Sequence, residues 1–192
     1  MNHLPLQHAV VILAAGASRR LGTSKQLLTL HGESLVNRTI RIALETHPGQ
    51  TVVVLGHQAG EIVASIKYND IECVTCTDWE NGMSASLRSG IQHVHSGCEG
   101  ALIVLCDQRH LNAHHLNRLC ATWRQHPDHA VASAYAGIIG VPAILPRTWF
   151  NHIAAIHGDH GARELLRQQD NVIRVKAPEL AWDIDTVQDL PS

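Results

Sequence analysis

The sequence lacks an excess of charge of either sign, any long apolar run, and the cysteine pattern of a secreted protein. Lys and Arg number 15 against 17 Asp and Glu, whereas a nucleic-acid-binding protein usually carries a broad basic excess. No apolar stretch approaches the about 20 residues that span a bilayer, and residues 1–8 lack the charged start and apolar core of a secretory signal. The five cysteines are an odd number, so we expect free thiols. These absences predict a cytoplasmic protein that binds neither nucleic acid nor membrane.

Length and pattern indicate the fold class. A chain of 192 residues suits one domain, since roughly 70% of the unfolded surface can be buried at this size. No repeat, low-complexity tract or linker interrupts it, so we expect a single domain over residues 1–192. Apolar runs typical of buried strands alternate with helical patterns, and they lie at residues 9–13, 51–55, 71–75, 101–106, 130–134 and 171–175. This alternation predicts an α/β fold with a mostly parallel central sheet flanked by helices.

Capping residues and breakers indicate where several helices begin and end. We expect Ser34 to cap a helix that stops at residues 48–49, and Asn112 to cap one that runs through about Arg124. Further helices should follow Gly60 and residues 81–82 and should lie within 158–169, and Thr186 should cap a short terminal helix. Glycines and prolines punctuate the region after residue 135, which predicts a hairpin or an irregular substrate loop there.

The most informative segment joins the first apolar run to a Gly/Ser loop with three cations. Gly16 and Gly22 permit the φ values of a tight turn, and Arg19, Arg20 and Lys25 can neutralise several phosphate oxygens. It is not a Walker A loop, in which Gly-Lys-Ser/Thr opens a helix, because Lys25 lies three residues beyond Gly22. The segment predicts a nucleoside triphosphate site, and the alternative is a solvated basic surface loop.

Together with Arg19, Gly22 and Lys25, residues 13–16 resemble the signature of the molybdenum-cofactor nucleotidyltransferases, in particular the cytidylyltransferase branch. Four further segments match in the family's order, at residues 81–87, 106–108, 158–163 and 183–186. The resemblance implies a Rossmann-like nucleotidyltransferase fold, with an NTP-binding part at about 9–110 and an acceptor-binding part at about 111–192. It also implies Mg²⁺-dependent transfer of CMP from CTP to the phosphate of molybdopterin or molybdenum cofactor, with pyrophosphate released. A molybdenum hydroxylase would be the client enzyme.

The resemblance assigns the donor nucleotide to the first loop and to the segment before the helix that follows Gly82. The implied contacts are Leu13, Ala14, Ala15, Gly16, Ser18, Arg19, Gly22, Lys25, Gly82, Ser84 and Ser86. Arg19 and Lys25 would hold the phosphates of the leaving group. Ala15 stands where guanylyltransferases have Gly, which favours CTP over GTP as the donor. Ser84 and Ser86 could hydrogen-bond a base edge, or they could merely start a helix.

Asp107 follows a buried apolar run directly, so its carboxylate should emerge at the edge where open α/β sheets place ligands. A carboxylate there suits Mg²⁺, which is usually held by one or two carboxylates plus phosphates; the alternative is a turn or a helix cap. The resemblance favours the metal and implies Asp185 as the second ligand, although Asp185 could instead support the final helix. Because phosphate transfer needs positioning and charge neutralisation, we expect Arg19, Lys25 and Asp107 to be catalytic, without a nucleophilic side chain.

Two departures from the family concern the acceptor. The family's Gly-His-Pro is Gly-Val-Pro at residues 140–142, so an imidazole is missing, and Arg109 replaces a proline. We expect Arg109, Pro142 and Arg163 to bind the acceptor, although Arg163 could serve only as a charge at a helix start. The alternatives are guanylyl transfer, NTP transfer to another small phosphorylated acceptor, and a non-catalytic molybdenum-cofactor chaperone.

Two other patterns carry less weight. Cys73 and Cys76 have a redox spacing, but they lie within or at the end of a predicted strand, without the helix N-terminus that lowers a thiol pKa. The histidines, including His110, His114 and His115 at helical spacing, are expected to be mostly solvated surface.

Overall fold

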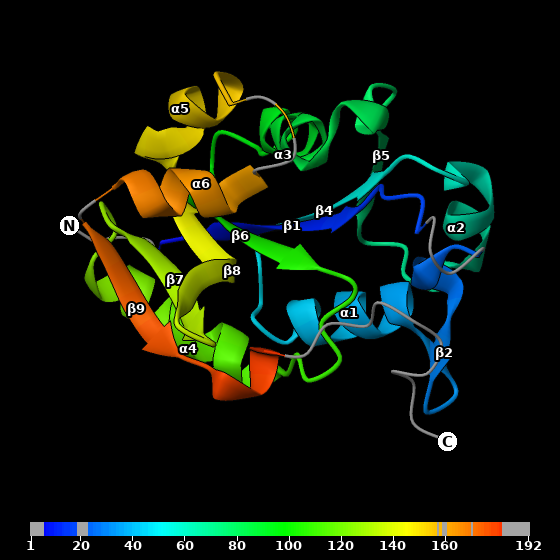
Figure 1. Ribbon diagram of the computed structural model, residues 1–192, viewed down its shortest axis with the longest axis horizontal. Coiled ribbons are helices and arrows are strands. Elements are labelled where there is room, and N and C mark those ends of the chain that lie inside the picture. Colours follow the sequence, from blue (N-terminus) through cyan, green and yellow to red (C-terminus); the bar gives the residue numbers. More distant parts are fainter. Residues whose placement is uncertain (1–5, 19–22, 157, 159–160, 170, 182–192) are drawn as a thin grey trace.

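The computed structural model describes residues 6–18, 23–156, 158, 161–169 and 171–181 (Figure 1). Its centre is a seven-stranded sheet with the strand order β5-β4-β1-β6-β8-β7-β9. The strands of this sheet are β1 (His8–Ala14), β4 (Gln50–Leu55), β5 (Glu72–Thr75), β6 (Gly100–Leu105), β7 (Ala130–Tyr135), β8 (Ile138–Pro146) and β9 (Val172–Lys176). A small separate sheet pairs β2 (Thr29–Leu30) with β3 (Glu33–Ser34).

The central sheet is mostly parallel, as the sequence predicts. Strand β1 pairs in parallel with β4 and β6, β4 with β5, and β7 with β9, while β8 runs antiparallel to both β6 and β7. All of β1 is buried, because a parallel strand at the centre is covered on both faces. Strand β6 ends at Leu105, one residue earlier than expected, so Cys106 and Asp107 lie in the turn beyond it.

Helices cover both faces of the sheet (Figure 1). On one face lie α3 (Met83–Gln92), α5 (Phe150–Ala154) and α6 (Gly161–Gln168), and on the other lie α1 (Leu35–Leu44), α2 (Ala59–Ser65) and α4 (Ala113–Gln125). Successive side chains of a strand point to opposite faces. Val11 of β1 accordingly belongs to the core with Leu87 of α3, and Ile12 belongs to the core with Ile40 of α1. Among the described residues, none of the helices is long and apolar enough to cross a membrane.

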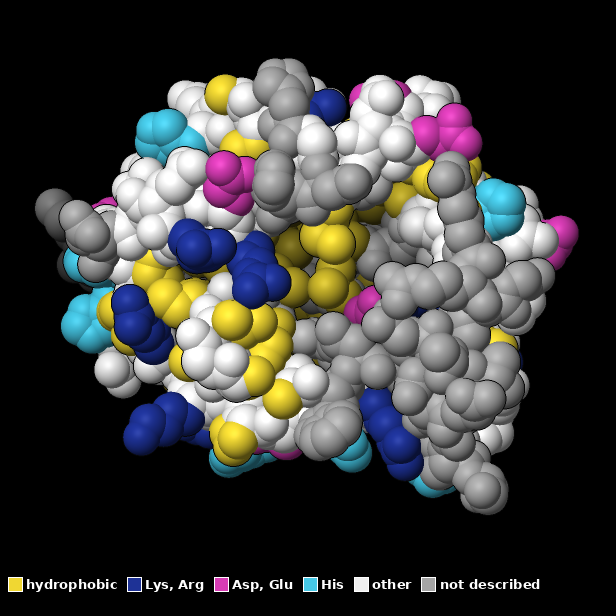
Figure 2. All heavy atoms as spheres, viewed as in Figure 1, with side chains coloured by type: hydrophobic (Ala, Val, Ile, Leu, Met, Phe, Trp, Pro, Cys, Tyr) yellow, Lys and Arg dark blue, Asp and Glu magenta, His cyan; other side chains and the backbone are white. Residues whose placement is uncertain are grey.

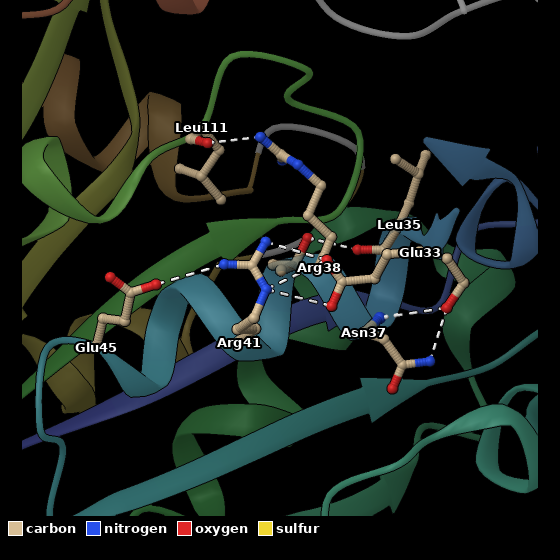
Figure 3. Close-up of polar contacts among 9 residues, drawn as sticks. Glu33, Leu35, Asn37, Arg38, Arg41, Glu45 and Leu111 are labelled. Carbon is tan, nitrogen blue, oxygen red and sulfur yellow. Dashed lines mark hydrogen bonds and ion pairs between the residues drawn. The ribbon is translucent and has the colours of Figure 1, made fainter. Parts of the chain in front are cut away.

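Two of the expected helix caps are confirmed. The Ser34 hydroxyl accepts from the Asn37 backbone N–H at the start of α1, and the Asn112 side chain accepts from the His115 N–H at 2.9 Å at the start of α4. On the exposed side of α1, Arg41 binds Glu33 at 3.0 Å and Glu45 at 3.4 Å (Figure 3). Surface ion pairs of this kind contribute little to stability, so the buried face of α1 holds the helix in place.

A hairpin joins β7 and β8, which decides between the two expectations for this region. Its two central residues, Ala136 and Gly137, have φ values of 47° and 74°. Positive φ at both positions is the mark of a type I′ turn, whose twist suits a two-residue hairpin. The register shifts between Ala132 and Ser133, and this irregularity lies opposite Gly140 and Ala143 of β8. The 140–142 segment is therefore part of a strand and is held from both sides.

Candidate active site

The carboxyl ends of β1, β4 and β6 lie side by side and carry three loops. A Cβ atom on Gly56, after β4, would lie 2.7 Å from the Ala15 carbonyl oxygen and 2.5 Å from Trp79 Cγ. The His57 backbone N–H donates to that same Ala15 oxygen at 3.0 Å. The loop after β4 thus packs against the loop after β1. Only glycine fits at position 56, where the two loops meet. Figure 2 shows a hollow near the carboxyl end of β6, with apolar side chains in it and basic side chains beside it.

An ion pair joins the first loop to the turn after β6. Lys25 Nζ lies 2.9 Å from Asp107 Oδ2, and the two side chains are only 19% and 23% exposed. The other oxygen, Asp107 Oδ1, is buried and has no hydrogen-bond partner among the residues that the structure describes. An unpaired buried acceptor is costly, and a carboxylate oxygen is the ligand that Mg²⁺ and Mn²⁺ prefer. The chemistry of this position therefore fits a divalent cation.

Asp107 is the single described carboxylate of the expected metal site. Asp185, the second expected ligand, lies outside the described residues. Within the described part of the chain, His, Cys, Asp and Glu side chains form no group of three or more that could hold a metal. Arg19 and Gly22 of the expected donor site also lie outside the described residues.

Hydrogen bonds from one short 3-10 helix, η1 (Lys25–Leu27), shape the first loop. The Gln26 side chain is buried, and its Nε2 donates to the carbonyl oxygens of Ala14 at 2.8 Å and Gly16 at 3.0 Å. The Lys25 backbone N–H donates to Ser18 Oγ at 3.1 Å. The loop thus turns back on the end of β1, which brings the Lys25 side chain toward Asp107.

The other expected donor residues divide into exposed and buried positions. Gly16 is exposed, whereas Leu13, Ala14 and Ala15 are buried at the end of β1. Gly82, with a φ of 97°, is the N-cap residue just before α3. Ser84 and Ser86 of that helix are buried, and the Ser84 hydroxyl donates to the Gly158 carbonyl oxygen at 2.5 Å. In this conformation Ser84 joins α3 to the segment before α6.

The three expected acceptor residues differ in environment. Arg109 is half-buried in the turn after Asp107, Pro142 is buried in β8, and Arg163 is exposed on α6. On the other side of that turn, Arg38 of α1 donates from Nη2 to the Leu111 carbonyl oxygen at 2.8 Å (Figure 3). The turn that carries Asp107 and Arg109 is therefore anchored to α1 as well as to β6.

Three side chains, two of them buried, hold the carbonyl groups of the 140–142 segment. The Val141 oxygen accepts from Gln108 Nε2 at 2.8 Å and from the Tyr135 hydroxyl at 2.9 Å. The Pro142 oxygen accepts from Ser133 Oγ at 2.6 Å. Where the family has an imidazole, this chain thus has an apolar side chain on a backbone that several donors fix.

Most of the described histidines are exposed or half-buried, as expected, and His115 is an exception. It is 1% exposed, and its Nε2 lies 2.7 Å from Ser133 Oγ. Burial lowers the pKa of His115 to about 4, so its ring is neutral at pH 7. His115 is buried because it lies on the inward face of α4 beside Leu116 and Leu119, while His114 and His110 are exposed.

Two thiols near this edge of the sheet are poor nucleophiles. Burial raises the pKa of Cys106, the residue before Asp107, to about 12. Burial also raises the pKa of Cys76, which follows β5. A thiol of raised pKa stays protonated at neutral pH, in keeping with a reaction that uses no cysteine.

The fold and these contacts agree with a comparison against known families. The family described as "MobA-like NTP transferase domain" matches residues 10–172. The chain belongs to this family. The match spans the 3-10 helix with Lys25, the turn with Asp107 and the β7–β8 hairpin, and membership is consistent with nucleotidyl transfer.

Two curated relatives resemble this member of the MobA-like family over nearly their whole length. The purine catabolism protein PucB of Bacillus subtilis is 31% identical over 191 residues, which cover 93% of this chain and 92% of the relative. Nicotine blue oxidoreductase of Paenarthrobacter nicotinovorans is 30% identical over 192 residues, which cover 94% and 93%. The relatives' names thus include an oxidoreductase as well as a protein of purine catabolism.

A solved structure supports the fold of this family member. The protein Rv0371c of Mycobacterium tuberculosis H37Rv superposes with a TM-score of 0.87 at 30% identity, covering 97% of this chain and 96% of the other. A manganese complex of Rv0371c gives a TM-score of 0.78 at 25% identity, covering 91% and 90%. A divalent metal thus occurs in a complex of a structural neighbour.

Two residues of the site escaped sequence reasoning. Gln26 and Gln108 directly follow Lys25 and Asp107, and both are almost fully buried. Each is an uncharged polar residue beside an expected catalytic residue, and Gln108 also lies within the matching segment 106–108. The sequence does not predict that both amides donate hydrogen bonds to backbone carbonyls.

Proposed function

We propose that this protein is a cytoplasmic enzyme that transfers CMP from CTP to the phosphate of molybdopterin or molybdenum cofactor and releases pyrophosphate. The observation that carries the proposal is the Lys25–Asp107 pair at 2.9 Å. It lies at the carboxyl ends of β1 and β6 in a chain of the MobA-like NTP transferase family. A cation beside a carboxylate with one unpaired oxygen suits a triphosphate bound with a metal.

The donor would bind along the first loop. Lys25 would leave Asp107 for the β- and γ-phosphate oxygens of CTP, and Arg19 would add a second cation. Backbone groups of residues 13–16, 18 and 22, with Gly82, Ser84 and Ser86, would complete the nucleotide site. Ala15 supports CTP over GTP as the donor. Because these groups neutralise charge on the leaving pyrophosphate, they lower the barrier without forming a covalent intermediate.

Asp107 would hold a divalent cation, Mg²⁺ in our proposal, with Asp185 as the second protein ligand. When bound, the cation neutralises charge on the α-phosphate and on the departing pyrophosphate. The unpaired Asp107 Oδ1 supports this role, because it leaves one carboxylate oxygen available while Oδ2 accepts from Lys25.

The acceptor would approach from the side of β8 and α6. Arg109, Pro142 and Arg163 would bind it, and an acceptor phosphate oxygen would attack the α-phosphorus. A new oxygen–phosphorus bond forms as the bond from the α-phosphorus to the pyrophosphate oxygen breaks. We divide the single domain accordingly, with donor binding at about 9–110 and acceptor binding at about 111–192. A molybdenum hydroxylase would receive the product.

The test is pyrophosphate release from CTP, GTP, ATP and UTP with Mg²⁺, each with and without molybdopterin or its molybdenum form. We expect release that requires both CTP and the acceptor, and its loss in Asp107→Asn. Preference for GTP would overturn the donor assignment, and release with a different phosphorylated acceptor would overturn the acceptor assignment. Nucleotide binding without release under any condition would favour a non-catalytic cofactor chaperone.

The similarity to nicotine blue oxidoreductase gives a second candidate, reduction of an organic substrate at the same edge of the sheet. The Lys25–Asp107 pair favours phosphate transfer, because lysine and aspartate side chains do not take part in electron transfer. Lys25 suits the phosphates of a triphosphate, and Asp107 suits the metal bound with it. Incubation with nicotine blue and a reduced nicotinamide dinucleotide separates the two. Bleaching of the dye without pyrophosphate release in the first assay would favour the oxidoreductase.

A further inference from the structure

We propose that Gln26 and Gln108 are a matched pair of positioning residues, of which Gln26 fixes the donor loop and Gln108 fixes the acceptor-side segment of β8, residues 140–142. The proposal rests on the proposed function, because it takes residues 13–18 as the donor side and residues 140–142 as the acceptor side. Each glutamine follows one member of the Lys25–Asp107 pair in the sequence, and they are 3% and 2% exposed.

Gln26 fixes two alternate peptide planes of the donor loop. Its Nε2 donates to the carbonyls of Ala14 and Gly16, while the carbonyl between them, that of Ala15, accepts from the His57 N–H. In a trans peptide the C=O and the following N–H point in opposite directions. The N–H groups of Ala15 and Ala17 therefore point away from Gln26, in a direction that two hydrogen bonds determine.

The identity of the amide atoms in Gln26 follows from the same contacts. Two carbonyl oxygens face the amide, and a carbonyl accepts but cannot donate, so the nitrogen must lie on that side. A buried amide with both donor sites committed holds one rotamer. Gln26 is thus a rigid support under a loop that would otherwise depend on Gly16, the residue type with most backbone freedom.

Gln108 acts in the same way on the other side of the ion pair. Its Nε2 donates to the Val141 carbonyl, which also accepts from Tyr135, and the next carbonyl, that of Pro142, accepts from Ser133. The peptide planes on both sides of Pro142 are therefore fixed. Because Gln108 is the residue after Asp107, a shift of the 140–142 segment would also move the Asp107 carboxylate.

The arrangement predicts a crossed pattern of kinetic effects. Gln→Met keeps the length of the side chain and removes the amide donors. We expect Gln26→Met, which loses two hydrogen bonds, to raise the KM for CTP roughly tenfold or more with little change in the KM for the acceptor. We expect Gln108→Met, which leaves Tyr135 on the Val141 oxygen, to raise the KM for the acceptor roughly fivefold with little change for CTP. Exposed Gln92 supplies the control, and Gln92→Met should change neither constant.

Amide hydrogen exchange of the free protein gives a readout that does not depend on turnover. In Gln26→Met, exchange should rise over residues 14–18 and stay unchanged over 139–144, and Gln108→Met should show the reverse. If the wild-type protein turns over no acceptor, the proposed function fails, yet exchange still tests the positioning roles. Binding of CTP alone, measured by calorimetry, then replaces the donor KM.

Several results would overturn the pair of roles. Equal increases of both KM values in each variant, or a fall in stability with both constants unchanged, would mean that the two amides support the fold in general. Exchange that rises over residues 139–144 in Gln26→Met, or over residues 14–18 in Gln108→Met, would also overturn the two roles. If a Met variant fails to fold, Gln26→Glu and Gln108→Glu keep the shape and remove the donors when ionised, and the same crossed pattern is required of them.

Discussion

Acidification should destabilise this protein through two buried histidines, His8 of β1 and His115 of α4. His8 is 0% exposed, with its Nε2 2.9 Å from Thr46 Oγ1, and His115 is 1% exposed. Burial lowers the pKa of each to about 4, from an ordinary value of 6.5. In the unfolded chain both rings take up a proton as the pH falls through 6.5, whereas in the folded protein they stay neutral until about pH 4. The unfolded state binds more protons in this window, so stability falls with falling pH.

The size of the effect follows from the two pKa values. Between pH 7.5 and pH 5.0 each histidine should lower the free energy of unfolding by about 2 kcal/mol, so the pair should lower it by about 4 kcal/mol. That is a large share of the roughly 5–15 kcal/mol by which folded proteins are stable. Above pH 7.5 the same groups should contribute no further pH dependence.

Urea unfolding at pH 7.5 and pH 5.0 measures this difference. His8→Gln and His115→Gln should each remove about half of the histidine contribution to the pH dependence, whatever they do to stability at pH 7.5. Exposed His152 of α5 supplies the control, since His152→Gln removes no buried ring. If both buried variants keep the wild-type difference between the two pH values, the histidines are not neutral in the folded protein and the reasoning fails.

Three further substitutions test the site and the fold. Lys25→Ala should cut turnover by roughly 10²-fold or more, because a preorganised donor to the leaving group is lost; normal turnover would remove Lys25 from the site. Gly56→Ala should weaken CTP binding by roughly tenfold, because the added methyl meets the Ala15 oxygen at 2.7 Å; Gly60→Ala, with open space around it, is the control in calorimetry. Asn112→Ala should cost about 1 kcal/mol in urea unfolding, and Asn112→Ser should recover most of it.

The layered fold could be predicted because its strands are continuous apolar runs. β1 and β4 lie within one residue of the predicted ends, since buried parallel strands admit few polar residues. The caps at Ser34 and Asn112 could also be predicted, because capping depends on neighbours in the sequence.

The β7–β8 hairpin could not be decided from the sequence for a local reason. Type I′ turns favour Asn-Gly or Asp-Gly, whereas here the turn residues are Ala136 and Gly137. Ala136 has a positive φ of 47°, which alanine rarely adopts, so pairing of the two strands decides the conformation. Turn propensities describe only the local sequence and therefore cannot predict a turn that strand pairing decides.

The meeting of Lys25 and Asp107 was within reach of the sequence, although they are 82 positions apart. Both were expected at carboxyl ends of parallel strands, and such ends share one edge of the sheet. Gln26 and Gln108 were out of reach, because a glutamine has the same local pattern whether its amide meets water or a backbone carbonyl. Their roles depend on which carbonyls the tertiary fold brings within 3 Å.

The same distinction bears on acceptor choice. At residues 140–142 the sequence shows only that the family's histidine is replaced by valine. Taken alone, that replacement suggests a changed acceptor. In the structure the Val141 and Pro142 carbonyls are held by Gln108, Tyr135 and Ser133, so the backbone there does not depend on the side chain at 141. Because the Val141 side chain is 9% exposed and belongs to the core, replacing it by His should lower the free energy of unfolding, while the hydrogen-bonded carbonyls hold the strand in place. If the proposed function holds, the acceptor KM in Val141→His should move while the CTP KM stays constant.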